Sequence, residues 1–282
     1  MTVRKGLVLE GGAMRGMFTN GVTDVMMENG ITYDGLIGVS AGAAFGCNYK
    51  SNQPGRAIRY NTDYCNDPRY CSIRSLIKTG DIYGAEFCYG TIPEQLDIFD
   101  WEAFEKNPME FHVVTTDVDT GKAVYKQCDH KEGCFDWIRA SASMPMVSRI
   151  SHLDGHRLLD GGMADSIPLR YAESTGFEKN VVVLTQPRGF VKEKSSSLPL
   201  MKILLGRYPN LIKAVERRHD MYNETLRYIE QREKEGAALV IAPEAPLGIG
   251  HVEKDASKLW AVYHLGRAVM EKQLDQLKEF LK

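Results

Sequence analysis

The chain has 282 residues, of which 43% are hydrophobic and 26% charged, and its formal net charge is −2. This length fits one large α/β domain or two smaller ones, and the near balance of charge argues against a nucleic-acid partner. No run of about 18 apolar residues is present, so no membrane-spanning helix is predicted, and no apolar signal segment precedes the first strand. We therefore expect a cytoplasmic protein.

The first predicted unit is a strand, a glycine-rich loop and a helix. The apolar run Gly6–Glu10 leads into Gly11–Gly16, and apolar residues at helical spacing then continue to a capping Gly30. Such a loop exposes backbone N–H groups that can hold an anion, either a phosphate or the oxyanion of acyl transfer. Its G-G-x-x-x-G spacing differs from the dinucleotide fingerprint, but Asp34 follows at the distance of a ribose-binding acid. Nucleotide binding stays open as an alternative.

The second predicted unit is a nucleophile elbow at Gly38–Gly42. A short strand over 33–37 precedes the pentapeptide Gly-Val-Ser-Ala-Gly, and small apolar residues after it begin a helix. A strand, a G-x-S-x-G turn and a helix together expose a serine hydroxyl above a sheet. The turn is tight enough to require glycine at Gly38 and Gly42, and the helix N-terminus favours negative charge beside Ser40.

A third motif places an aspartate at a strand end. Leu158–Gly162 is a short apolar run that ends in Asp160 and two glycines. Such a motif can be a simple turn, because Asp-Gly is a common turn dipeptide. His219, His251 and His264 lie in polar or helical contexts, and His152 and His156 lie before Asp160 in a polar hairpin turn, so none of the seven histidines stands out as a base. A serine with an aspartate as its direct partner is therefore the simplest interpretation.

The remaining elements alternate between strands and helices. Segment 51–93 is rich in Tyr, Asn, Asp and Arg, and we expect an irregular insertion or lid there. Further predicted elements are strands at 110–116, 123–125, 180–185 and 237–241, and helices at 135–141 and 259–281. This order predicts a three-layer α/β/α sandwich with a mostly parallel central sheet. We expect a catalytic core over 1–190 and a helical and strand extension over 191–282, packed on that core.

The stretch Phe190–Asp220 combines apolar residues with seven basic and three acidic ones. We expect a helix pair packed on the sheet, with peripheral membrane contact left open because basic amphipathic segments can lie on anionic surfaces. The six cysteines are scattered, and Cys128 and Cys134 with His130 between them lack a second ligand pair. We expect reduced thiols and no bound metal.

The ordered motifs resemble the patatin-like phospholipase family, in its bacterial acyl hydrolases. Gly11–Gly16 resembles the family's oxyanion loop with Arg15 at its basic position, and Gly38–Gly42 resembles its serine elbow. Asp160–Gly162 is similar to the D-G-G/A motif, and Arg139–Pro145 to the small-residue segment before it. Ala13 departs from the pattern, because family members commonly have a third glycine there.

The resemblance implies a Ser40–Asp160 dyad, with Gly11, Gly12, Ala13 and Arg15 at the oxyanion hole. It implies hydrolysis of carboxylic esters of lipids, as in phospholipases A and lysophospholipases, with no cofactor and no metal for the dyad. A lipid or ester is then the expected partner. Calcium dependence and oligomeric state stay open, and a non-catalytic lipid-binding module is a further alternative.

Overall fold

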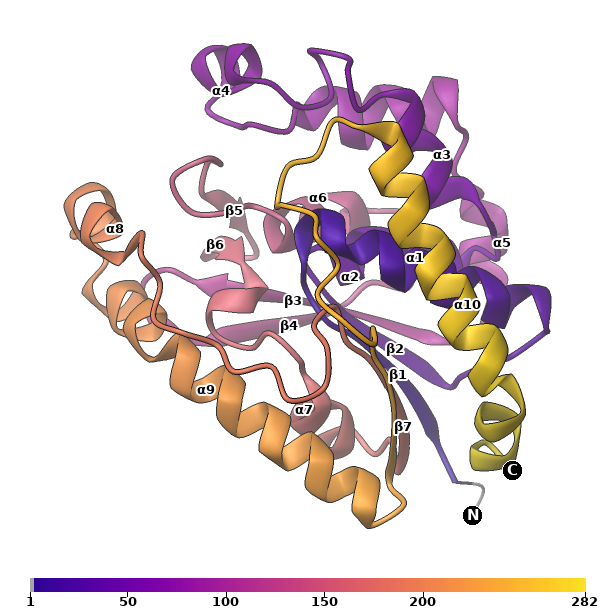
Figure 1. The fold of residues 1–282 in the computed structure, drawn as a ribbon. Coiled ribbons are helices and arrows are strands. Elements are labelled where there is room, and N and C mark those ends of the chain that lie inside the picture. Colours follow the sequence, from indigo (N-terminus) through magenta and orange to yellow (C-terminus); the bar gives the residue numbers. More distant parts are fainter. Residues whose placement is uncertain (1–2) are drawn as a thin grey trace.

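The computed structural model describes residues 3–282. Within this range the chain forms one sheet of eight strands, in the order β5-β6-β3-β2-β1-β7-β8 with β4 also pairing with β3 (Figure 1). The strands are β1 (Lys5–Leu9), β2 (Gly35–Val39), β3 (Glu110–Asp117), β4 (Ala123–Gln127), β5 (Ser151–Leu153), β6 (His156–Asp160), β7 (Lys179–Val183) and β8 (Ala238–Ile241). The neighbouring strands β3, β2, β1, β7 and β8 pair parallel in that order. By contrast, β4 and β6 pair antiparallel with β3, and β5 pairs antiparallel with β6.

Helices cover both faces of this sheet, which confirms the predicted three-layer α/β/α sandwich (Figure 1). The helices are α1 (Gly16–Glu28), α2 (Ala41–Lys50), α3 (Arg56–Asp63), α4 (Ile73–Thr79), the π-helical η2 (Phe87–Leu96), α5 (Trp101–Lys106), α6 (Cys134–Ser141), α7 (Leu169–Ser174), α8 (Leu198–Leu205), α9 (Pro209–Lys234) and α10 (Ala256–Phe280), with short 3-10 turns η1 (Ala13–Arg15) and η3 (Gly161–Met163). Successive side chains of a strand point to opposite faces. Leu7 and Leu36 therefore pack with α1 and α10, while Val8 and Ile37 pack on the α7 and α9 side.

The predicted elements agree with the structure except in segment 51–93. The strands expected at 110–116, 123–125, 180–185 and 237–241 are present as β3, β4, β7 and β8, within a residue or two at their ends. The strand expected at 33–37 is shifted to Gly35–Val39 because its parallel pairing with β3 continues to the elbow. Segment 51–93 is not irregular: it contains α3, α4 and most of η2, which are short and carry no long apolar stripe.

The C-terminal helix α10 packs closely along α1. A Cβ on Gly21 would lie 2.0 Å from the carbonyl oxygen of Tyr263, and one on Gly266 would lie 2.0 Å from that of Phe18. The Tyr263 hydroxyl also donates a 2.7 Å hydrogen bond to buried Asp24. The predicted helix pair in Phe190–Asp220 is present as α8 and the start of α9. No helix within residues 3–282 combines the length and apolar character that crossing a bilayer requires.

Candidate active site

The predicted elbow is a sharp turn between β2 and α2. Ser40 has φ 54° and ψ −120°, a backbone conformation that is strained for a residue with a side chain. The turn tolerates no Cβ at its glycines: one on Gly38 would lie 2.6 Å from Ala43 Cα, and one on Gly42 would lie 2.4 Å from the Leu9 carbonyl oxygen. The expected need for glycine at both positions is thus confirmed by the packing.

A serine on α6 holds the elbow in place. The Ser40 N–H donates to Ser141 Oγ at 2.8 Å, and the Ser141 hydroxyl donates to the Val114 carbonyl at 2.6 Å. All three groups are buried. An unpaired N–H in such surroundings costs about 1–3 kcal/mol, so Ser141 stabilises the strained turn by giving this donor a partner.

Ser40 and Asp160 meet directly. The Ser40 hydroxyl donates to Asp160 Oδ2 at 2.6 Å, although 120 residues separate them in the sequence. The topology explains the meeting: β2 lies beside β3, β3 pairs with β6, and both residues lie where their strands end. The other carboxylate oxygen accepts the Gly162 N–H at 2.8 Å, and the Asp160 N–H donates to the Ser143 carbonyl at 2.8 Å.

The surroundings of Asp160 change its acidity. Burial raises the pKa of this carboxyl above its usual value, while the hydrogen bonds from Ser40 and Gly162 and the charge of Arg218 act in the opposite direction. Burial disfavours the charged form because it removes the water that stabilises a carboxylate. A carboxylate with a raised pKa is a better proton acceptor, so Asp160 is suited to take a proton from the hydroxyl that it contacts.

The glycine-rich loop lies against the elbow. A Cβ on Gly11 would be 3.1 Å from the Cβ of Ser40. The Gly11 N–H is already engaged with the Ser166 carbonyl at 3.4 Å, whereas the N–H groups of Gly12 and Ala13 have no acceptor among residues 3–282. Of the predicted oxyanion-hole residues, Gly12 and Ala13 therefore offer free backbone donors. Gly11 instead allows the loop to lie close to Ser40, because it has no side chain.

Ala13 and Arg15 each show an unusual feature. Ala13 has φ 48°, in the left-handed region that glycine adopts most easily, which explains why an alanine at this position is a departure. Arg15 forms no ion pair within residues 3–282, and its buried Nε has no hydrogen-bond partner. Arg15 is therefore not held by a carboxylate of the described residues.

The nucleotide alternative depends on Asp34, which the fold places at the wrong end of the sheet. Asp34 precedes β2 and accepts the Lys5 N–H at 2.6 Å, at the amino ends of the strands. The Gly11–Gly16 loop follows β1, at the carboxyl ends. In a dinucleotide site the acid and the loop lie together at the carboxyl ends, so Asp34 cannot contact a ribose bound at this loop.

Neither a histidine nor a metal cluster competes with this pair. Within residues 3–282 no histidine forms a hydrogen bond with Ser40 or Asp160, and His156 instead contacts Asp117 at 2.8 Å. No three His, Cys, Asp or Glu side chains converge as metal ligands in that same range.

A cavity opens beside Ser40 and is lined mostly by apolar and aromatic side chains. Its lining includes Ala44 and Phe45 of α2, Tyr89 and Ile92 of η2, and Ile138 of α6. Segment 51–93 supplies much of this wall, as predicted. None of the described lining residues of this cavity comes from Phe190–Arg218.

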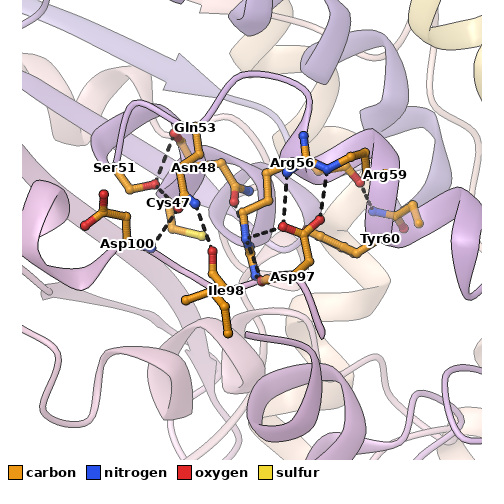
Figure 2. A network of polar contacts seen from close by, with 12 residues as sticks. Cys47, Asn48, Ser51, Gln53, Arg56, Arg59, Tyr60, Asp97, Ile98 and Asp100 are labelled. Atoms are coloured by element: carbon orange, nitrogen blue, oxygen red, sulfur yellow. Dashed lines mark hydrogen bonds and ion pairs between the residues drawn. The ribbon is translucent and has the colours of Figure 1, made fainter. Parts of the chain in front are cut away.

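A polar network fixes this wall to the elbow helix (Figure 2). The buried Arg56 donates to Asn48 Oδ1 of α2 at 2.8 Å and to the Asp97 carbonyl at 3.1 Å, which joins α3 to the end of η2. Arg59 contacts both carboxylate oxygens of Asp97, and Gln53 donates to the Ile98 carbonyl at 2.9 Å. Arg56 also forms an ion pair with the Asp97 carboxylate at 3.5 Å. Because a carboxylate held by two arginines is difficult to displace, the network keeps η2 against the cavity.

Sequence reasoning missed two residues that support the site. Ser141 lies in the small-residue segment Arg139–Pro145. Its short polar side chain, which can bond to a nearby backbone group, was the only sequence feature that could have indicated this role. Arg218 on α9 donates through Nε to the Gly162 carbonyl at 2.5 Å and so supports the turn that follows Asp160. Nothing in the sequence pattern pointed to Arg218, since 56 residues separate it from Gly162.

Comparison with known families and proteins gives a consistent result. A family model described as patatin-like phospholipase matches residues 7–173, and one described as a domain of unknown function matches residues 208–282. The uncharacterized protein YjjU of Escherichia coli K12 is 29% identical over 198 residues, which are 65% of this chain and 52% of that protein. The lysophospholipase nte1 of Aspergillus niger is 28% identical over 61% of this chain and 11% of its own length. The chain thus spans about half or less of these relatives.

A solved structure resembles the whole fold. The crystal structure of VipD from Legionella pneumophila superimposes with a TM-score of 0.51 and covers 98% of this chain and 67% of the VipD chain. The two sequences are 11% identical, so this likeness bears on the fold alone.

Proposed function

The chain belongs to the patatin-like phospholipase family, and within it we propose that this protein is a serine acyl hydrolase that cleaves carboxylic esters of lipids. The family and the lysophospholipase relatives support lipid acyl hydrolysis at the family level. The observation that carries the finer proposal is the 2.6 Å hydrogen bond from Ser40 Oγ to Asp160 Oδ2. In this proposal residues 1–190 form the catalytic core, with residues 1 and 2 outside the described range, and residues 191–282 pack on it.

The first half of the reaction transfers the acyl group to Ser40. The Ser40 oxygen attacks the ester carbonyl while its proton passes to Asp160 Oδ2. The resulting oxyanion accepts hydrogen bonds from the free N–H groups of Gly12 and Ala13, each worth about a hundred- to a thousandfold in rate. The intermediate collapses to a serine ester, and the leaving alcohol takes the proton back from Asp160.

The second half releases the acid. A water molecule gives a proton to Asp160 and attacks the serine ester, which forms a second oxyanion at the same two N–H groups. This intermediate collapses to a free carboxylic acid, and Ser40 recovers its proton from Asp160. Asp160 thus acts twice as base and twice as acid, which its buried position and raised pKa favour.

The cavity beside Ser40 is the proposed acyl site. Its apolar lining suits a hydrocarbon chain, and burial of each methylene group contributes about 0.8 kcal/mol. Ser40, Ala13 and Met14 also line it, so a chain that enters this cavity carries its ester to the nucleophile and to the donors of the loop.

Peripheral membrane contact through α8 is part of the same proposal. This helix buries Met201 but exposes Leu200, Ile203 and Leu204, of which Ile203 is 80% exposed. Arg207 follows them, and Lys202 lies among them although it also pairs with Glu216 at 2.6 Å. Basic and apolar side chains together suit an anionic lipid surface. The helix lies at the periphery of the molecule (Figure 1). Binding to phosphatidylserine-containing vesicles should weaken in Ile203→Glu; equal binding by both proteins would contradict this contact.

The test of the proposed function is hydrolysis of p-nitrophenyl acyl esters, followed by phospholipids, lysophospholipids and glycerides. We expect activity on esters that Ser40→Ala removes, with circular dichroism confirming an intact fold. Retention of full activity by Ser40→Ala would exclude Ser40 as the nucleophile. The absence of ester hydrolysis by the wild type across the panel would favour a lipid-binding role.

A further inference from the structure

One wall of the cavity beside Ser40 carries a charged side chain among apolar ones. Phe135, Ile138 and Arg139 of α6 line the cavity together with Ala142 at the end of that helix. Residues three and four positions apart lie on one face of a helix, so these four form a single stripe along the cavity. Three members of the stripe are apolar, and Arg139 is the exception.

The Arg139 guanidinium has no partner in the protein. It is half-buried, and within residues 3–282 it forms no ion pair, side-chain hydrogen bond or cation–π contact. Arg56, the other arginine of the cavity, is the contrast: it is 3% exposed and contacts both Asn48 and Asp97. Because arginine stays protonated in proteins, the free N–H groups of Arg139 remain donors that need an acceptor.

A second free donor lies near Arg139. Tyr89 lines the cavity from η2, and its ring centre lies 6.4 Å from that of Phe135. Its hydroxyl makes no hydrogen bond within residues 3–282. Burial raises the pKa of Tyr89, and the Arg139 charge acts in the opposite direction, so the two groups are close enough to interact. The protonated hydroxyl and the guanidinium thus offer donors to the same cavity.

No carboxylate of the cavity pairs with Arg139. Asp81 is the one acid among the described lining residues, and it forms no ion pair within residues 3–282. It instead accepts the Arg149 N–H at 2.7 Å, which ties it to the segment that follows α6. The mostly apolar cavity therefore contains a cation and a hydroxyl that have no acceptor in the protein.

We propose that Arg139 and Tyr89 bind a carboxylate inside the acyl site, so that the preferred acyl chains carry a second, free carboxyl group. The inference rests on the proposed function, because it names the class of ester cleaved: half-esters of dicarboxylic acids. A carboxylate accepts two parallel N–H bonds from one guanidinium and has a further lone pair for a phenol. The apolar lining would bury the methylene groups between the ester and the carboxylate, whereas a chain that ends in a methyl group would leave Arg139 without an acceptor.

The experiment compares the mono-p-nitrophenyl esters of adipic, suberic and sebacic acids with p-nitrophenyl hexanoate, octanoate and decanoate. The two esters of each pair have the same number of acyl carbons and differ in the terminal carboxylate. In the wild type we expect the ratio of their kcat/KM values to favour the carboxylate at the length that spans from Ser40 to Arg139. A ratio that favours the methyl end at all three lengths would overturn the subsite.

Arg139→Met should lower this ratio about tenfold to a hundredfold, the loss expected for hydrogen bonds to a charged group. Arg139→Lys should retain part of the preference, and Tyr89→Phe should reduce it less than Arg139→Met does. Arg149→Met is the matched control, because Arg149 is exposed and does not line the cavity. An unchanged ratio in Arg139→Met, or an equal loss in Arg149→Met, would overturn the subsite.

A second arm does not require catalysis. Calorimetric titration of Ser40→Ala with monomethyl suberate measures the subsite directly, and circular dichroism checks the fold of each variant. Addition of Arg139→Met should weaken this binding about tenfold or more. Equal binding with and without Arg139→Met, or no binding to Ser40→Ala, would overturn the subsite. If the wild type hydrolyses no ester, the proposed function fails, and the titration still decides whether the subsite exists.

Discussion

The two walls around Ser40 differ in chemistry and in origin. The apolar wall is formed by α2, α3, η2 and α6, and its cavity reaches the nucleophile. The cationic wall is formed by Arg15, Lys192 and Arg218, three half-buried basic residues that form no ion pair within residues 3–282. The first wall is joined to the elbow by hydrogen bonds within residues 48–100, whereas the second depends on long-range contacts such as Arg218 with Gly162.

Under the proposed function, this difference gives the reaction and its selectivity separate structural sources. In the proposed function the Ser40–Asp160 pair acts on any ester that reaches it. Under the same proposal, we expect the apolar wall to select the acyl chain and the cationic wall to act on the rest of the molecule. A substitution in one wall should therefore alter one preference, whereas a substitution in the pair should affect every substrate alike.

The largest effect is expected for Asp160→Asn. An amide cannot accept the Ser40 proton, and loss of a general base typically costs about a hundred- to ten-thousandfold in rate. The amide oxygen can still accept the Gly162 N–H, so the fold should be kept. Steady-state rates with short neutral and long phosphorylated esters check this, and the loss should be the same for both. A loss confined to one class would break the separation between reaction and selectivity.

The next largest effect is expected for Ser141→Ala. This change leaves the Ser40 N–H without its partner in a buried place, at a cost of about 1–3 kcal/mol. We expect kcat to fall by about ten- to a hundredfold with KM nearly unchanged, because the elbow is displaced and the walls are not. Ser141→Cys retains a weak hydrogen-bonding group and should lose less. Equal rates for the wild type and Ser141→Ala would show that the elbow does not need this bond.

A smaller effect is expected for Ala85→Leu, which should alter only the preference for acyl-chain length. Ala85 lines the cavity, and a larger side chain would fill part of the space for the acyl chain. Activity on p-nitrophenyl octanoate should fall about tenfold relative to the acetate, since a few methylene groups at about 0.8 kcal/mol each lose their burial. Glu86→Leu, at the neighbouring exposed position, is the control and should leave the chain-length profile unchanged. A profile unaffected by Ala85→Leu would place the acyl chain elsewhere.

The smallest effect is a pH shift in Arg218→Gln. Asp160 must be ionised to accept a proton, so activity rises as the pH increases through its pKa. Because burial raises that pKa, the acidic limb should lie above the value of about 4 for an ordinary carboxyl. The Arg218 charge lowers the pKa of Asp160, and its removal should move the limb to higher pH. The pH profile of kcat/KM with a neutral ester measures this; a limb that moves to lower pH would contradict the assignment.

The sequence predicted the apolar side of the site better than the cationic side. Ser40, Asp160 and the Gly12–Ala13 loop could be recognised because each follows a strand and has a local motif. Segment 51–93 was recognised as a cover for the site but not as helical, since its helices are short and polar. Arg218 could not be predicted, because only the packing of α9 brings it beside Gly162. Local patterns specify turns, whereas contacts over long separations depend on the whole fold.

The most direct test of the central claim is the identification of the acylated residue. The protein would be quenched with acid during turnover of p-nitrophenyl butyrate, digested and analysed by mass spectrometry. The account predicts a butyryl group on Ser40 that forms in the wild type and is absent from Ser40→Ala. Hydrolysis without any adduct on Ser40, accompanied by undiminished activity of Ser40→Ala, would contradict it.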